Sequence, residues 1–346
     1  MPAMCGAVQP VNTVEPVSAD EPVSRAASDK PLAVIVAGPT CSGKSALALR
    51  LAERLGGTIV NADSMQVYRE LRVLTARPTA EDEGRVPHAL YGVRPAAHAA
   101  DVAWWRAQAE AAMRDAAGAG RVPILCGGTG LYLAALAGTL AEIPHPGAAA
   151  REEARTMLAG IGAPALHARL AAADPDTAAT LHPSDGQRLA RAWEVWRGTG
   201  RGLAAWHARQ TTRDLPWRLR VVLLDPPRDA LRAAIAARCD TMLAGGALAE
   251  LDRLLALDLD PALPAMRAHG VPELAAFRRG ALSLAQARTR MCLATGQYTK
   301  RQATWFRHQD IAAGGGVHKL IARYGSDAQS MDDMLAKTLA YISNHG

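Results

Sequence analysis

The chain has 346 residues, 49% of them hydrophobic, and a formal net charge of +6. This length predicts one large domain or two, with enough apolar residues for a sizeable core. The charge is compatible with a polyanionic partner, but lysine is rare, and a genome biased toward arginine would give the same balance.

The five cysteines are odd in number and include no C-x-x-C pair, which argues against a disulfide framework or a zinc knuckle. Cys41 and Cys126 are predicted to be small buried residues. This pattern fits a reducing cytosol, so we expect a cytoplasmic protein.

Residues 1–30 lack an apolar run long enough for a signal sequence and have no helical or strand periodicity. We predict a disordered leader there. No later stretch approaches the length of a membrane span, so no membrane partner is expected.

Strands and helices alternate in the next part of the chain. The strands are expected at 31–38, 58–64 and 121–130, and the helices from Lys44 to the glycine pair 56–57, at 101–120 and at 131–138. This order predicts an α/β fold, with a P-loop NTPase-like parallel sheet covered by helices on both faces.

From about 143 to 214 the sequence predicts only helices, separated by proline and glycine. A strand returns at 217–225, and helices follow at 227–244, 246–257, 271–278, 283–307 and 331–343. We therefore expect the following organisation: a leader at 1–30, an α/β catalytic core from 31–142 and 215–325, a helical insertion domain at 143–214, and a C-terminal helix within 326–346.

A phosphate-binding loop of the form G-x-x-x-x-G-K-S joins the first strand to the first helix, which is the context that this motif requires. Backbone N–H groups and the helix N-terminus attract an anion there, the lysine reaches phosphate oxygens, and the final serine is a natural Mg²⁺ ligand. The loop consists of Gly38, Pro39, Thr40, Cys41, Ser42, Gly43, Lys44 and Ser45.

An acidic residue at the end of a strand would decide what the loop does. Asp225 ends a late strand, but two prolines follow it, so a cap on the next helix is the favoured interpretation. Asp63 ends the strand after the loop helix, and we expect that strand to lie beside the first. One carboxylate and one hydroxyl would suit the deprotonation of a nucleophile better than the activation of water.

Five motifs now carry a resemblance. In chain order they are GPTCSGKS, NADSMQVY, CGGTGLY, HPSDGQRLARAWEVWRGTG and TGQYTKRQATWFR. Over roughly residues 31–310 the chain resembles the tRNA dimethylallyltransferase (tRNA isopentenyltransferase) family. The resemblance implies that dimethylallyl diphosphate occupies the loop. Its prenyl group would pass to N6 of adenine 37, beside the anticodon of tRNAs that read codons beginning with U.

The resemblance also implies the catalytic residues. Asp63 would accept the proton of the adenine amine, Thr40 would lie near the reacting centre, and Arg238 would contact the diphosphate. Mg²⁺, with Ser45 as its ligand, is the expected cofactor, and the enzyme is expected to be a monomer.

The anticodon stem-loop would contact residues in several motifs, because the enzyme must extract a stacked adenine from the loop. A solvated arginine face, or the apolar side of a core helix, would explain parts of the same pattern. The residues that match tRNA-contacting positions of the family are Asp63, Ser64, Met65, Gln66, Thr129, Arg151, Gln187, Arg188, Leu189, Ala190, Arg191, Arg267, Lys300 and Arg301.

The sequence departs from the family pattern at two places. Val271 and Pro272 stand where the family often has Tyr-Arg, and Gly296 replaces an expected arginine. Two alternatives remain open. One is a P-loop small-molecule kinase with an arginine-rich lid, and the other is a nucleic-acid-binding module whose loop has a structural role.

Overall fold

The computed structural model describes residues 30–210, 214–312, 316–325 and 327–343. The predicted leader therefore lies outside the described residues, apart from Lys30. Within the described ranges, no helix has the length and apolar character needed to cross a membrane.

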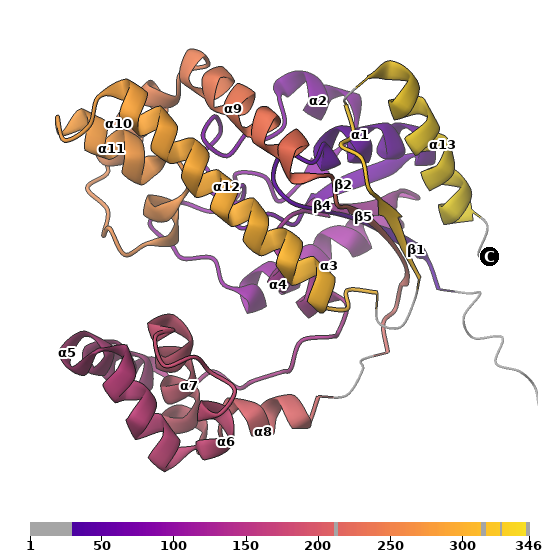
Figure 1. Cartoon of the computed structure of the whole chain (residues 1–346). Helices are drawn as coiled ribbons and strands as arrows, with labels where there is room; N and C mark the ends of the chain where they lie inside the picture. The colour runs from indigo at the N-terminus through magenta and orange to yellow at the C-terminus, as the bar shows by residue number, and fades with distance from the viewer. Residues whose placement is uncertain (1–29, 211–213, 313–315, 326, 344–346) are drawn as a thin grey trace, which may run out of the picture.

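A six-stranded parallel sheet forms the centre of the α/β part (Figure 1), in the order β3-β2-β4-β1-β5-β6. Its strands are β1 Leu32–Ala37, β2 Gly57–Asn61, β3 His88–Ala89, β4 Val122–Gly127, β5 Arg218–Leu224 and β6 Val317–Leu320. The predicted α/β class is confirmed.

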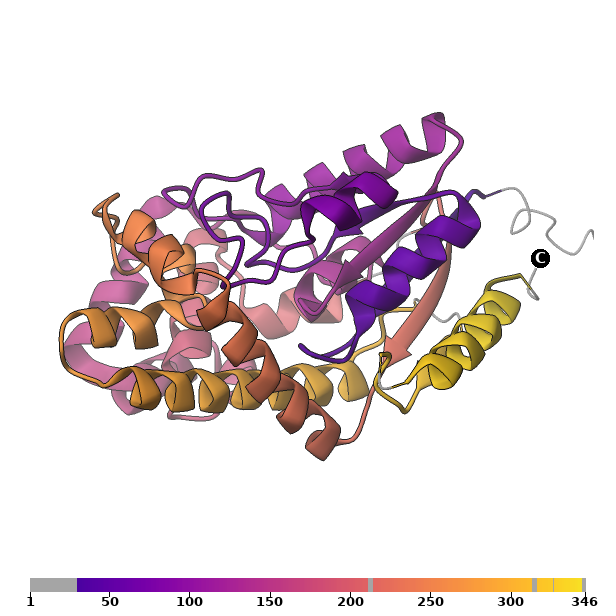
Figure 2. The same ribbon diagram turned by 90° about the horizontal axis from the view of Figure 1, so that it is seen from above.

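Helices cover both faces of the sheet (Figure 2), and alternate residues of β1 contact each layer. Val34 and Val36 pack with α1 (Lys44–Leu55) and α13 (Ala328–Ser343). Ile35 faces the opposite layer, where α3 (Val102–Gly118), α4 (Gly130–Leu136) and α9 (Arg228–Ala244) lie. Asp101 caps α3 as predicted, accepting a hydrogen bond from the Trp104 backbone at 2.8 Å.

Four further elements extend the α3 side of the core: α10 Ala247–Leu255, the 3₁₀ helix η2 Pro264–Arg267, α11 Val271–Arg278 and α12 Leu284–His308. The long helix α12 starts with a capping box between Ser283 and Gln286. It packs along α9, α11 and α4, so its middle and end reach the carboxyl edge of the sheet (Figure 1).

The helices α5 Ala148–Ala173, α6 Pro175–Ala178, α7 Gly186–Thr199 and α8 Leu203–Ala208 form a second group, which Figure 1 shows below the sheet. A kink at Gly162, where φ is 74°, divides α5. Leu166, Leu170 and Leu189 belong to a hydrophobic cluster of this group alone. The domain boundaries themselves stay a prediction.

Three expectations need correction. The strand at Asp63 does not lie beside the first strand, because β4 pairs with both β1 and β2 and separates them. Asp225 does not cap α9, whose N-cap is Pro227; its carboxylate pairs with Lys319 at 3.1 Å. Cys41 is only partly buried, whereas Cys126 is buried as expected.

Four elements were not predicted: α2 Ala80–Arg85, β3, η2 and β6. Each is short. The helix α2 rests on a capping box between Thr79 and Asp82, and β3 contributes only two residues to the sheet.

Candidate active site

The phosphate-binding loop lies where the sequence places it, between the end of β1 and the start of α1. Gly43 is the N-cap of α1 with φ of 90°, and it makes no side-chain cap, so the first N–H groups of the helix stay available to a ligand. A Cβ at this position would lie 2.0 Å from the carbonyl oxygen of Tyr324. Only glycine fits this close approach.

Two side chains of the loop have polar atoms with few or no hydrogen-bond partners, and a bound anion would supply these partners. The Lys44 ammonium reaches only the Pro39 carbonyl oxygen, at 3.4 Å. The Ser42 hydroxyl is buried and has no hydrogen-bond partner within the described part of the chain. The loop is therefore shaped to accept phosphate oxygens.

Asp63 follows β2 in a tight turn that fixes its carboxylate. Its N–H donates to the Asn61 side chain at 2.8 Å, and its Oδ1 accepts from the Met65 N–H at 2.9 Å. Asn61 is itself held, because its side-chain amide donates to the carbonyl oxygen of Leu90 at 3.1 Å. No described residue contacts Oδ2, which is thus available to a substrate.

Asp63 lines a cavity together with both other predicted catalytic residues, Thr40 and Arg238. We call it the Asp63 cavity. His269 and Tyr298 also line it, and their rings lie 4.9 Å apart. Thr40 and Asp63 converge although β4 lies between β1 and β2, because the carboxyl ends of parallel strands share one edge of the sheet.

Most of the remaining lining of the Asp63 cavity is apolar. Leu74, Ile235, Met242 and Met291 contribute side chains from the loop after β2, from α9 and from α12. Such a wall suits a small hydrocarbon group.

Hydrogen bonds to the backbone hold the other catalytic candidates. The Arg238 guanidinium donates to the Thr75 carbonyl oxygen at 3.0 Å. The Gln302 side chain accepts from the Thr40 N–H at 2.9 Å and donates to the Gly128 carbonyl oxygen at 2.8 Å. Gln302 therefore links α12 to the phosphate-binding loop and to β4. Sequence reasoning missed this role, although Gln302 lies inside the quoted motif TGQYTKRQATWFR, four residues after Tyr298.

Two titratable groups of the cavity are shifted toward their neutral forms. Burial raises the pKa of Tyr298 to about 12, and the nearby Asp63 charge acts in the same direction. Burial also lowers the pKa of His269. Both side chains are therefore neutral near pH 7, and Asp63 faces no cation from this pair.

The predicted RNA-contacting residues fall into two groups. Beside the Asp63 cavity, Thr129 accepts from the Ser64 N–H at 2.9 Å and Met65 lines the cavity, whereas the Gln66 amide binds the carbonyl oxygens of Thr75 and Ala76 inside its own loop. Arg267, Lys300 and Arg301 are exposed on η2 and α12.

The second group lies on α5 and α7. Glu194 brings Arg151 and Arg191 together, pairing with the former at 3.8 Å and with the latter more closely. Arg188 is exposed and pairs with Asp185 at 3.7 Å. Gln187 is exposed and Ala190 half-buried, but Leu189 is 0% exposed, so its side chain packs in the helical group and cannot contact RNA.

A phosphate-binding loop at the edge of a parallel sheet, open to a cavity with one carboxylate, defines a P-loop protein that acts on a phosphorylated substrate. The profile of the IPP transferase family matches residues 66–309, and that of isopentenyl transferases matches residues 32–86. The chain belongs to the IPP transferase family.

Comparison with individual relatives supports this family membership. The chain is 58% identical over 311 residues to the tRNA dimethylallyltransferase of Granulibacter bethesdensis, covering 90% of this chain and 97% of the relative. The enzyme of the same name from Gluconacetobacter diazotrophicus is 58% identical over 316 residues, or 91% and 95% of the two chains.

Solved structures show the same fold. The tRNA isopentenylpyrophosphate transferase of Bacillus halodurans is 28% identical with a TM-score of 0.65, covering 91% of this chain and 98% of that one. A eukaryotic dimethylallyltransferase acting on tRNA, 24% identical, has a TM-score of 0.77 with coverage of 91% and 80%.

Proposed function

We propose that this protein transfers a dimethylallyl group from dimethylallyl diphosphate to N6 of adenine 37 in the anticodon loop of tRNA, releasing diphosphate. The observation that carries the proposal is the Asp63 cavity, where a carboxylate, a phosphate-binding loop and an apolar wall meet. Membership of the IPP transferase family supports it.

The chemistry follows from this arrangement. The amine of adenine is a poor nucleophile because its lone pair is delocalised into the ring. The carboxylate of Asp63 would accept the amine proton as the N–C bond forms, while the C–O bond to the diphosphate breaks and its electrons pass to the leaving oxygen. The apolar wall would surround the prenyl group while its carbon carries positive charge.

The leaving diphosphate would lie in the phosphate-binding loop. Backbone N–H groups, Lys44 and Arg238 would stabilise the negative charge that develops on it. Thr40 lines the cavity at the junction between loop and prenyl pocket, so its hydroxyl would contact the oxygen that joins carbon to phosphorus.

The residues present fit Mg²⁺. The Ser45 side chain is exposed at the N-terminus of α1, and the described residues include no cluster of three metal-binding side chains. Mg²⁺ retains several water ligands and often binds through substrate phosphates. Ser45 and the diphosphate would therefore hold the ion, and it would neutralise charge on the leaving group.

The anticodon stem-loop would lie across α12 and the helical group, where Arg188, Arg191, Lys300 and Arg301 carry positive charge. We further propose that the enzyme acts as a monomer in the cytoplasm.

The test is transfer of label from dimethylallyl diphosphate to anticodon stem-loop RNA with adenines at positions 36 to 38, followed by nucleoside analysis for N6-dimethylallyladenosine. RNA with guanine at position 37 is the control substrate. Phosphate release from ATP without any label transfer would contradict the proposal and support the kinase alternative.

A further inference from the structure

A second cavity lies on the other side of the phosphate-binding loop. We call it the Ser45 cavity; it is lined by Ser45, Arg50, Arg77, Arg85, His88 and Tyr91, among others. The loop borders both cavities, contributing Thr40 to one and Ser45 to the other. An anion in the loop can therefore meet side chains from two directions.

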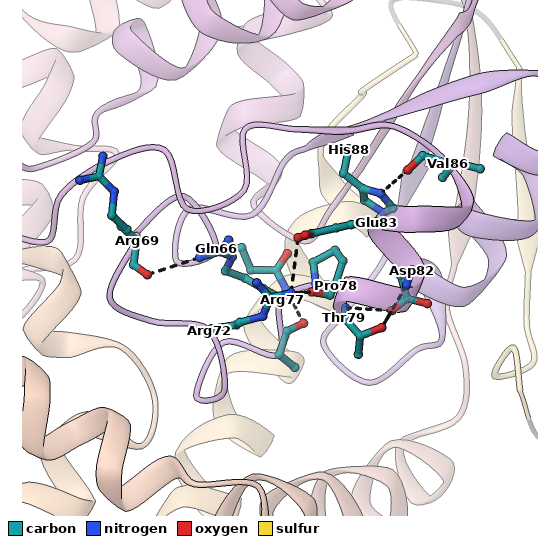
Figure 3. A network of polar contacts seen from close by, with 11 residues as sticks. Gln66, Arg69, Arg72, Arg77, Pro78, Thr79, Asp82, Glu83, Val86 and His88 are labelled. Carbon is teal, nitrogen blue, oxygen red and sulfur yellow. Dashed lines mark hydrogen bonds and ion pairs between the residues drawn. The ribbon is translucent and has the colours of Figure 1, made fainter.

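The segment after β2 forms a wall that both cavities share. Its residues Leu74 and Thr75 line the Asp63 cavity, and the next residues, 76–78, line the Ser45 cavity. Figure 3 shows Arg77 in this segment, close to Gln66, Arg72 and Glu83.

Arg77 differs from the other arginines of the Ser45 cavity. Arg85 pairs with Glu53 at 2.7 Å and Arg50 with Asp332 at 3.9 Å. Arg77 makes only a long contact to the Arg69 carbonyl oxygen, at 3.4 Å, and within the described ranges no carboxylate lies in ion-pair distance of it. Its Nε is buried and lacks a hydrogen-bond partner. A half-buried guanidinium whose buried Nε lacks a partner can accept an external anion.

The surrounding backbone holds the guanidinium in this place. Gln66 donates to the carbonyl oxygens of Thr75 and Ala76, at 2.9 and 3.0 Å, and Ala76 adopts φ of 48°. Gly92 lies against the guanidinium so closely that a Cβ there would be 2.1 Å from its Nη1. A side chain that nothing needed to position would not require this fit.

The charge of Arg77 also reaches the centre of the site. Tyr91 lies beside it: burial raises the pKa of Tyr91 well above its usual range, the Asp63 charge raises it further, and Arg77 opposes both. Tyr91 therefore lies within electrostatic range of the carboxylate of one cavity and the guanidinium of the other. Tyr91 and Cys126 both line the Ser45 cavity.

We infer that Arg77 is a second diphosphate-binding arginine, which holds the terminal phosphate from the Ser45 cavity while Arg238 acts from the Asp63 cavity. The inference rests on the proposed function for the identity of the ligand. One short segment would set both arginines, because Arg238 donates to the Thr75 carbonyl oxygen, two residues before Arg77. Arg77 transfers no proton; its hydrogen bonds would stabilise the departing diphosphate.

The experiment measures binding of inorganic pyrophosphate with Mg²⁺ by calorimetry, alongside kcat and KM for prenyl transfer. Arg77→Ala should weaken pyrophosphate binding roughly tenfold or more, the usual effect of losing a charge-assisted hydrogen bond. The pyrophosphate affinity of Arg77→Lys should lie between those of Arg77→Ala and the wild type. The affinity of both variants for stem-loop RNA should stay unchanged. Wild-type pyrophosphate binding and kcat in Arg77→Ala would overturn the inference.

A glycine pair provides a test that leaves Arg77 in place. Gly92→Ala should displace the guanidinium and weaken pyrophosphate binding in the same direction. Gly120→Ala is the matched control, because Gly120 also has positive φ, 70°, but has open space where a Cβ would lie. Equal effects of the two alanines would show that backbone strain, and not Arg77, determines binding.

Failure of the inference about Arg77 and failure of the proposed function can be distinguished. Lys44→Ala should abolish pyrophosphate binding, which establishes that the loop is the site measured. If wild-type protein binds pyrophosphate but transfers no prenyl group, the proposed function fails, and the arginine is still judged by the binding data. Thermal unfolding of each variant separates loss of binding from loss of fold.

Discussion

The α/β core and the helical group α5–α8 position their candidate residues in opposite ways. In the core, Asp63, Thr40 and Arg238 are each fixed by hydrogen bonds to or from the backbone at 2.8–3.0 Å. In the helical group, the exposed Arg188 pairs with Asp185, and the half-buried Arg191 pairs with Glu194, so these arginines are held by carboxylates rather than by the backbone.

The difference reflects two tasks. Catalytic groups are more effective when their orientation is set before the substrate arrives. An arginine that binds RNA exchanges a carboxylate partner for an RNA phosphate, so each single contact adds little binding free energy. Substitutions should therefore have large, local effects in the core and small, graded effects in the helical group.

The largest effect is expected from removing the base. Asp63→Ala should lower kcat by about 10²–10⁴-fold, the range for a positioned general base, because Asp63 is the carboxylate that lines the cavity. RNA affinity, measured by filter binding, should stay within a few-fold of the wild type. An enzyme that keeps full activity without this carboxylate would remove the proposed base.

A second test compares a buried carboxylate of the core with an exposed one of the helical group. Glu250 is 3% exposed and accepts three backbone hydrogen bonds, from Arg72, Val73 and Leu74, at 2.7–2.9 Å. Glu250→Gln places an amide against these donors, so it should cost about 1–3 kcal/mol of unfolding free energy.

The matched control is Glu152→Gln in α5, where Glu152 is exposed and paired with Arg155. It should leave stability unchanged in urea unfolding. Because the segment held by Glu250 lines the Asp63 cavity, Glu250→Gln should also raise KM for the prenyl donor. Equal stability of both variants would mean that the buried contacts do not hold this segment.

A smaller effect is expected from the helical group. Arg188→Ala should weaken stem-loop binding a few-fold and reduce the slope of log K against log salt by about 0.7–0.9, the value for one phosphate contact. At saturating RNA, kcat should be unchanged. Binding titrations between low and moderate salt measure both quantities, with Arg232→Ala as a control, since Arg232 is an exposed arginine on α9 that pairs with Asp229 in the core. A kcat defect in Arg188→Ala would place this arginine in the chemistry instead.

The smallest effect concerns pH. Burial lowers the pKa of His269 below 6.5 in the folded state, so the unfolded chain binds the proton first. Stability from this residue should be complete above about pH 6.5 and decrease as pH falls below it. His269→Gln should therefore lose less stability than the wild type between pH 7.5 and pH 5.5 in denaturant titrations. The comparison isolates His269 from His318, whose pKa is also lowered. Parallel pH profiles of the two proteins would contradict the assignment.

Much of the fold could be predicted because local patterns determine it. The helix at 271–278 was predicted with its observed bounds, and α12 differs by one residue at each end, since a capping box marks its start. The two-residue strand β3 has no pattern to detect. The position of β4 between β1 and β2 is a property of the winding of the chain, which local sequence does not specify.

The site was predicted as far as motifs extend. The phosphate-binding loop, Asp63 and Arg238 belong to quoted motifs or to family positions, and they line one connected region. Arg77 stands outside the quoted motifs and Gln302 stands inside one of them, but the roles of both depend on contacts with segments distant in sequence. Leu189 lies inside a matching motif yet is buried, since a helix that presents arginines outward must turn other residues inward.

The contact between the phosphate-binding loop and the segment after β6 has a consequence for how the protein is made. Arg323 donates to the Cys41 carbonyl oxygen at 3.0 Å across 282 residues of chain, and Tyr324 donates to Ser42. A ribosome adds Arg323 only 282 residues after Cys41, so these supporting residues are made long after the loop. The nascent chain therefore completes the support of its phosphate-binding loop long after the loop itself has been made.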